Sequence, residues 1–196
     1  MTIPPLTGIC WSELDAEAKR ARLLAAAGEV FAREGLDAPM PAIAAAAGAG
    51  VGSVYRQFPA KRDLLAALAV ERHVEVAEEA GAALRDPGGP WAGLVALVWA
   101  IAERQAGDDV LGEAMATVSE HPAVVASVAT TMHALEDLLG AAKAEGRLRA
   151  DATALDLRLL FAATRASRGL EADAWRRMLE LGIDALEADA RRQPAR

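Results

Sequence analysis

Residues 43–58 read IAAAAGAGVGSVYRQF and are followed directly by PAKRDLL at residues 59–65. A short apolar run, a glycine-marked turn and a second short run ending in Tyr55 and Phe58 predict two short helices. The positive charges of Lys61 and Arg62 open a third helix. Two helices joined by such a turn form a helix-turn-helix, whose second helix lies in the major groove of DNA. This stretch therefore predicts a DNA-binding element near the N-terminus of a 196-residue chain.

Composition favours helices over strands along the whole chain. Alanine dominates, aromatic residues make up only 4%, and β-branched residues form no sustained alternating run. The only cysteine, Cys10, excludes an internal disulfide. No apolar run reaches the roughly 18 residues of a membrane-spanning helix, and the first residues lack the pattern of a signal peptide. We expect an all-α, cytoplasmic protein without a membrane segment.

Charge is distributed unevenly along the chain. The formal net charge is −7, but residues 12–64 hold seven Lys or Arg and seven Asp or Glu side chains. The whole net negative charge therefore falls after residue 64. Affinity for DNA depends on the local patch near the phosphates, so an acidic remainder of the chain does not exclude a DNA-binding domain.

Apolar periodicity, prolines and glycines predict about nine helices. The expected ranges are about 14–34, 41–47, 51–57, 61–84, 91–106, 109–119 and 122–145, then a helix opened by Thr153, and 172–190. Ser12 with Asp15, and Thr153 with Asp156, have the spacing of capping boxes. We expect a helix-turn-helix DNA-binding domain over 12–60 and a ligand-binding and dimerisation domain over 61–196, linked by the helix at 61–84.

Residues about 20–65 resemble the TetR family of bacterial transcriptional regulators. The matching elements are Ala26-Ala27, Phe31, Gly35, Ile43-Ala44, Ala47-Gly48, Gly52-Ser53-Val54-Tyr55, Phe58, Lys61 and Leu64-Leu65. The resemblance implies phosphate contacts from Tyr55 and Lys61. It also implies base or backbone contacts from the second helix of the motif, at Gly50, Val51, Gly52, Ser53, Arg56 and Gln57. The alternative for the first pair is a core aromatic and a solvated surface charge.

Three positions depart from the family's pattern. Pro39 stands where the family has a threonine or serine cap, Gly50 where serine is common, and Val51 where a polar or basic side chain is frequent. Few side chains of the predicted reading helix are therefore suited to base edges, and we expect phosphate contacts and DNA shape to carry a large share of binding.

The family also has an effector pocket and a two-fold dimer interface in its C-terminal region. Methionine and aromatic side chains shape apolar cavities, and His or Arg side chains orient polar ligand atoms. The candidate pocket residues are His73, Trp99, Met115, His121, Met132, Phe161 and Arg165. The alternative is that the Met and Trp side chains only fill the core. The candidate dimer residues are Leu155, Leu159, Ala163, Trp175, Leu179, Ile183 and Leu186.

The sequence thus predicts a homodimeric regulator, favoured as a repressor, that leaves a two-fold operator when a small, largely apolar effector binds. The alternative is an all-helical ligand-binding or scaffold protein that has lost DNA binding. No metal site, cofactor or catalytic residue is predicted, because the three histidines are scattered and no nucleophile elbow or phosphate loop is present.

Overall fold

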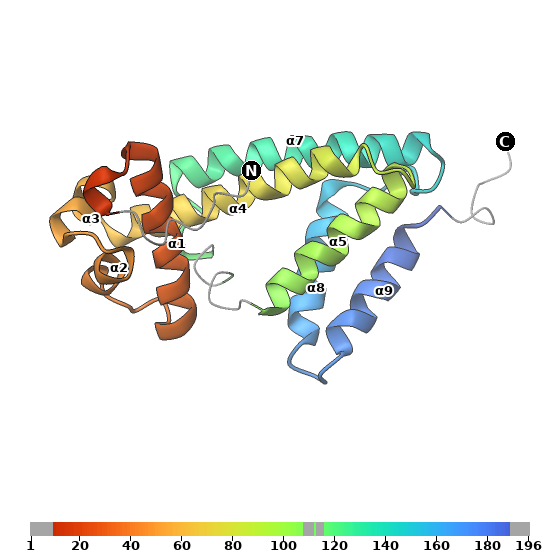
Figure 1. The fold of residues 1–196 in the computed structure, drawn as a ribbon. Helices are drawn as coiled ribbons and strands as arrows, with labels where there is room; N and C mark the ends of the chain where they lie inside the picture. The colour runs from red at the N-terminus through yellow and green to blue at the C-terminus, as the bar shows by residue number, and fades with distance from the viewer. Residues whose placement is uncertain (1–9, 108–111, 113–115, 189–196) are drawn as a thin grey trace, which may run out of the picture. The chain divides into compact units, whose positions relative to one another are not determined.

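The computed structural model describes residues 10–107, 112 and 116–188. Its regular structure in this part of the chain is helical, apart from one isolated bridge between Leu148 and Glu187. The elements are the 3-10 helix η1 (Trp11–Glu13) and the helices α1 (Ala16–Glu34), α2 (Met40–Ala47), α3 (Val51–Gln57), α4 (Lys61–Ala83), α5 (Pro90–Gly107), α7 (Pro122–Ala144), α8 (Ala154–Ser167) and α9 (Ala174–Leu186) (Figure 1). The prediction of an all-α fold is confirmed. Most of the helix expected at 109–119 lies outside the described residues.

Two predicted capping boxes have different outcomes. Asp15 itself is the N-cap of α1, and its Oδ1 accepts a hydrogen bond of 2.8 Å from the backbone N–H of Ala18. The capping box expected from Ser12 with Asp15 is therefore wrong, because Ser12 belongs to η1. At α8 the prediction is confirmed: the backbone N–H and the hydroxyl of Thr153 both donate to Asp156 Oδ2, at 2.7 and 2.8 Å.

The chain divides into two compact units. The first, which we call the head, comprises residues 1–71 and 108–125. The second, which we call the body, comprises residues 72–107 and 126–196. The long helices α4 and α7 each have residues in both units.

The core of the head combines residues from distant parts of the sequence. Leu23, Val30 and Phe31 of α1 are buried with side chains of α2, α3 and the first turns of α4. Val118 and Val124 belong to the same core, with exposed fractions of 0% and 2%. A segment about sixty residues after the end of α3 therefore completes the packing of the head.

The body is built from α5, α8 and α9 together with parts of α4 and α7, and α8 runs beside α9 (Figure 1). Two glycines allow close approach of helices. A Cβ on Gly93 of α5 would lie 2.2 Å from the carbonyl oxygen of Ala83 in α4, and one on Gly182 of α9 would lie 2.1 Å from Cδ1 of Leu160 in α8. Because the atoms next to Gly93 belong to the backbone, the lack of a side chain there sets the distance between α4 and α5, whereas at Gly182 the neighbouring atoms belong to a flexible leucine side chain.

Candidate functional site

The turn between α2 and α3 has the backbone that a helix-turn-helix requires. Gly48 follows α2 in the left-handed region, with φ of 66° and ψ of 29°. Its N–H donates to the carbonyl oxygen of Ala45, and the N–H of Ala49 donates to Ala44. Such a glycine C-cap ends one helix and reverses the chain without the strain that a Cβ would cause. The glycine at this position therefore allows α3 to start only three residues later.

Buried side chains fix α3 against the rest of the head. Ile43 of α2 and Val54 of α3 have no exposed surface, and Phe58 directly after α3 is 2% exposed. All three residues therefore pack in the core of the head. Since Val54 is the buried side of a seven-residue helix, the residues on the other sides of α3 face solvent.

The solvent-facing side of α3 carries the predicted DNA-contacting residues. Tyr55 is 45% exposed and Val51 is 39% exposed. Arg56 is also exposed, and its Nη2 donates a hydrogen bond of 3.1 Å to Ser53 Oγ. Gln57 is half-buried, and its Oε1 has no hydrogen-bond partner among the described residues. Gly50 and Gly52 are exposed on the same short helix and its N-cap. The exposure of Tyr55 argues against the alternative that it is a core aromatic.

Two cations of the head lie over aromatic rings. The Nζ of Lys61 is 5.7 Å from the centroid of the Phe31 ring, and the Cζ of Arg20 is 4.9 Å from the centroid of Phe58. Cation–π contacts of this kind contribute about 0.5–1 kcal/mol at exposed sites. They also hold positive charge close to both ends of the loop that follows α3, where a phosphate contact is predicted for Lys61.

Asp63 and His121 connect two helix starts within the head. Asp63 Oδ2 accepts a hydrogen bond of 2.8 Å from the N–H of Ala60, which precedes α4. Its Oδ1 lies 3.6 Å from Nε2 of His121, whose Nδ1 accepts from the N–H of Ala123 in the first turn of α7 at 3.3 Å. His121, predicted as a pocket residue, thus lies in the head, where it contacts the carboxylate at the start of α4.

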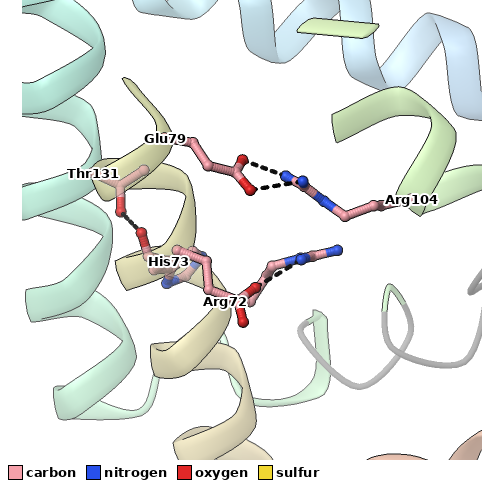
Figure 2. Close-up of polar contacts among 6 residues, drawn as sticks. Arg72, His73, Glu79, Arg104 and Thr131 are labelled. Carbon is pink, nitrogen blue, oxygen red and sulfur yellow. Dashed lines mark hydrogen bonds and ion pairs between the residues drawn. The ribbon is translucent and has the colours of Figure 1, made fainter. Parts of the chain in front are cut away.

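His73 is the candidate pocket residue with the clearest polar environment. It is half-buried on α4, and its Nδ1 lies 2.8 Å from Ser127 Oγ of α7. The buried Thr131 hydroxyl donates to the carbonyl oxygen of His73 at 2.8 Å (Figure 2). Burial lowers the pKa of His73, which favours the neutral imidazole.

An ion pair between α4 and α5, which was not predicted from the sequence, lies near His73. Arg104 of α5 donates two hydrogen bonds to the carboxylate of Glu79 on α4, at 2.6 and 2.7 Å (Figure 2). The hydroxyl of Thr164 on α8 was also not identified, although it is buried and has no hydrogen-bond partner among the described residues. No local sequence pattern indicates either feature. Glu79 and Arg104 are far apart in the sequence, and the Thr164 hydroxyl has no hydrogen-bond partner among the described residues.

The remaining pocket candidates are in different environments. Trp99, Met132 and Phe161 are partly buried against the core of the body. The ring of Trp99 lies edge-to-face on that of Trp175, with centroids 6.4 Å apart. Arg165 is exposed on α8, and Met115 lies outside the described residues.

The candidate dimer residues divide into two groups. Leu155 and Leu159, one turn apart on α8, are 57% and 59% exposed, and Ala163 and Ile183 are half-buried. In contrast, the side chains of three α9 candidates are buried in the core of the body, which leaves them little surface for a second chain. These are Trp175, Leu179 and Leu186. Leu181 of α9, which was not among the candidates, is 47% exposed.

No helix in the described ranges is long and apolar enough to cross a membrane. In the same ranges, no group of three His, Cys, Asp or Glu side chains is placed to hold a metal ion.

The comparisons with known proteins agree with this arrangement. Residues 23–68 match the model described as bacterial regulatory proteins, tetR family. A TetR transcription regulatory protein from Mycobacterium vanbaalenii is 30% identical, with a TM-score of 0.65 over 86% of this chain and 95% of that one. A TetR transcriptional regulator from Streptomyces coelicolor is 28% identical, with a TM-score of 0.66 over 87% and 99%.

The fold alone is shared with more distant structures. FadR of Thermus thermophilus, a TetR-family transcriptional repressor in complex with lauroyl-CoA, is 21% identical, with a TM-score of 0.59 over 90% of this chain and all of that one. The comparison with curated proteins finds no match. The exposed face of α3, the glycine turn before it and the likeness over most of the chain lead to one conclusion: the chain belongs to the TetR family of bacterial transcriptional regulators.

Proposed function

We propose that this protein is a dimeric repressor that binds a two-fold DNA operator through α3 and is released by a small, largely apolar effector. The observation that carries the proposal is the surface of α3. Its large exposed side chains face solvent on one side of a helix that buried residues hold in place. Family membership supports DNA as the partner of that surface.

The head offers two kinds of DNA contact. The hydroxyl of Tyr55 and the ammonium group of Lys61 are suited to phosphates beside the groove, which set position without reading sequence. Ser53, Arg56 and Gln57 carry the donors and acceptors that read base edges. Tyr55→Phe and Lys61→Ala are expected to weaken binding similarly for all operators, whereas Arg56→Ala and Gln57→Ala are expected to change the preference among operators.

A two-fold operator requires two heads about 34–36 Å apart, and therefore a dimer. The exposed leucines Leu155 and Leu159 of α8 and Leu181 of α9 support an interface on these two helices. Exposed apolar side chains on neighbouring helices are typical of surfaces that a second copy covers. We assign dimerisation to this face of the body.

We place effector binding in the body and its transmission in α4. Trp99, Met132 and Phe161 supply partly buried apolar surface, and His73 a neutral polar group. The lauroyl-CoA bound by the Thermus relative supports an effector with a large apolar part. An effector acts only if its affinity differs between the two head spacings. Helix α4, which has residues in both units, carries the change to Asp63 and Arg62 at its start.

The first experiment is fluorescence anisotropy of the full-length protein with promoter DNA flanking its own gene, at two salt concentrations and against random DNA. Binding that is tight, sequence-selective and weakened by salt is expected, because phosphate contacts release counterions. If a stable dimer shows no binding at low salt, the protein is instead the ligand-binding or scaffold protein that has lost DNA binding.

A further inference from the structure

We propose that Val51 determines part of the operator sequence by packing against the C5-methyl group of thymine. This inference rests on the proposed function, because it names the base that one residue of α3 reads. Valine stands here at a position where a polar or basic side chain is frequent in the family. The proposal explains what an apolar side chain does at that position.

The exposed side chains of α3 define a small apolar surface. Among the described residues of the head, the large hydrophobic side chains that are exposed are Val51, Tyr55 and Val125. Val51 and Tyr55 are four residues apart, so they lie on the same face of α3, one turn from each other. An exposed valine leaves apolar surface in water and favours neither helix formation nor solubility. Two large apolar side chains on one exposed face of α3, Val51 and Tyr55, therefore indicate contact with a partner.

The start of α3 offers little other than Val51 for reading bases. Gly50 and Gly52 on either side have no side chain, and among the described residues no atom beyond the neighbouring residues and the helix's own backbone lies within 4 Å of where a Cβ would stand at either position. Ser53 Oγ already accepts a hydrogen bond from Arg56. The two methyl groups of Val51 therefore project from a bare, open stretch of backbone.

Groove chemistry then identifies the base. The first residues of a recognition helix contact base edges in the major groove. Hydrogen-bond donors and acceptors cover those edges, and the apolar group that they present is the C5-methyl of thymine. An aliphatic side chain without donors or acceptors leaves polar base edges unpaired, so Val51 discriminates in favour of thymine and against the other bases.

The expected size of the effect follows from burial of one methyl group. Removing that methyl from one half-site weakens binding about fourfold, and removing it from both halves of a two-fold operator about fifteenfold. This loss of affinity is smaller than the loss expected when a bidentate hydrogen-bonded contact is removed. The test therefore needs both the substituted base and the protein variant.

The experiment replaces thymine by deoxyuridine, which lacks only the methyl group. Operators are first selected from random duplexes with the full-length wild-type protein, and each symmetric pair of thymines is then replaced in turn. Dissociation constants are measured by fluorescence anisotropy for wild type, Val51→Ala and Val125→Ala. Val125 is a matched control, since it is also an exposed valine of the head, at 55% against 39% for Val51, but lies on α7 instead of α3.

The wild type and Val125→Ala are expected to lose about fifteenfold in affinity at one thymine pair, while Val51→Ala binds the thymine and deoxyuridine duplexes equally at that pair. Circular dichroism confirms that the variants remain folded. The proposal is overturned if no thymine pair responds, or if Val51→Ala keeps the wild-type response. Absence of any sequence-selective binding by the wild type refutes the proposed function itself and is recognised before deoxyuridine is introduced.

Discussion

Gly93 is the position at which a single methyl group is expected to disturb the body most directly. It lies in the first turns of α5, against the last residue of α4. A Cβ built on Gly93 would stand 2.2 Å from the carbonyl oxygen of Ala83, 2.8 Å from its carbonyl carbon and 3.0 Å from its Cα. All three are backbone atoms, so a change of side-chain rotamer does not relieve the overlap.

The magnitude follows from two opposing terms. Ordinary contact begins near 3.4 Å, so the end of α4 must retreat by about 1 Å from its present position. Overpacking of this kind costs about 1–3 kcal/mol. Alanine in place of glycine inside a helix recovers up to about 1 kcal/mol. Gly93→Ala is therefore expected to lower the free energy of unfolding by about 1–2 kcal/mol.

The measurement is equilibrium urea unfolding followed by circular dichroism, at one protein concentration because the stability of a dimer depends on it. Gly140→Ala is the matched control, since Gly140 is inside α7 and, in the part of the chain that the structure describes, no atom outside the local helix lies within 4 Å of its Cβ position. That variant is expected to gain about 0.5–1 kcal/mol. If Gly93→Ala unfolds at the same urea concentration as Gly140→Ala, the close approach of α4 and α5 is not what requires glycine.

Three further predictions concern single residues. Gly48→Ala places a Cβ at a φ of 66° and is expected to lower the free energy of unfolding by about 1 kcal/mol in urea titrations, with Gly48→Asn affected less. Burial holds the pKa of His73 below 6.5, so the stability it contributes is present above that pH and is lost as the pH falls. The stability difference between wild type and His73→Asn in urea titrations should thus shrink between about pH 7.5 and pH 5.5. Glu79→Gln removes the carboxylate that accepts two hydrogen bonds from α5 and is expected to cost about 1 kcal/mol in thermal melts, more than Glu78→Gln at the exposed neighbouring position.

Local signals predicted most of the helices because those signals act within a few residues. Pro39 marks the start of α2, Gly48 its end and Thr153 the start of α8, and each lies where the structure has the corresponding boundary. The capping box predicted from Ser12 was wrong, since Asp15 is itself the N-cap of α1 and accepts the hydrogen bond from the N–H of Ala18. Where two local caps compete, spacing does not decide which one the helix uses.

Helical periodicity identifies an apolar face but not the surface that covers it. Val118 and Val124 are separated in sequence from the first segment of the head by the helices of the body, and only the folded chain shows that they belong to the core of the head.

The same limit applies to α9, whose apolar residues Trp175, Leu179, Ile183 and Leu186 were predicted to lie in a dimer interface. An amphipathic helix has one apolar stripe. In α9 this stripe includes Trp175 and Leu179, which are buried within a single chain, where α9 packs against α8 and α5. A second chain can then meet only what remains exposed, chiefly Leu155 and Leu159 of α8 with Leu181 of α9. Charged substitutions at these three positions should therefore separate the dimer, while substitutions at Trp175 should unfold the body first.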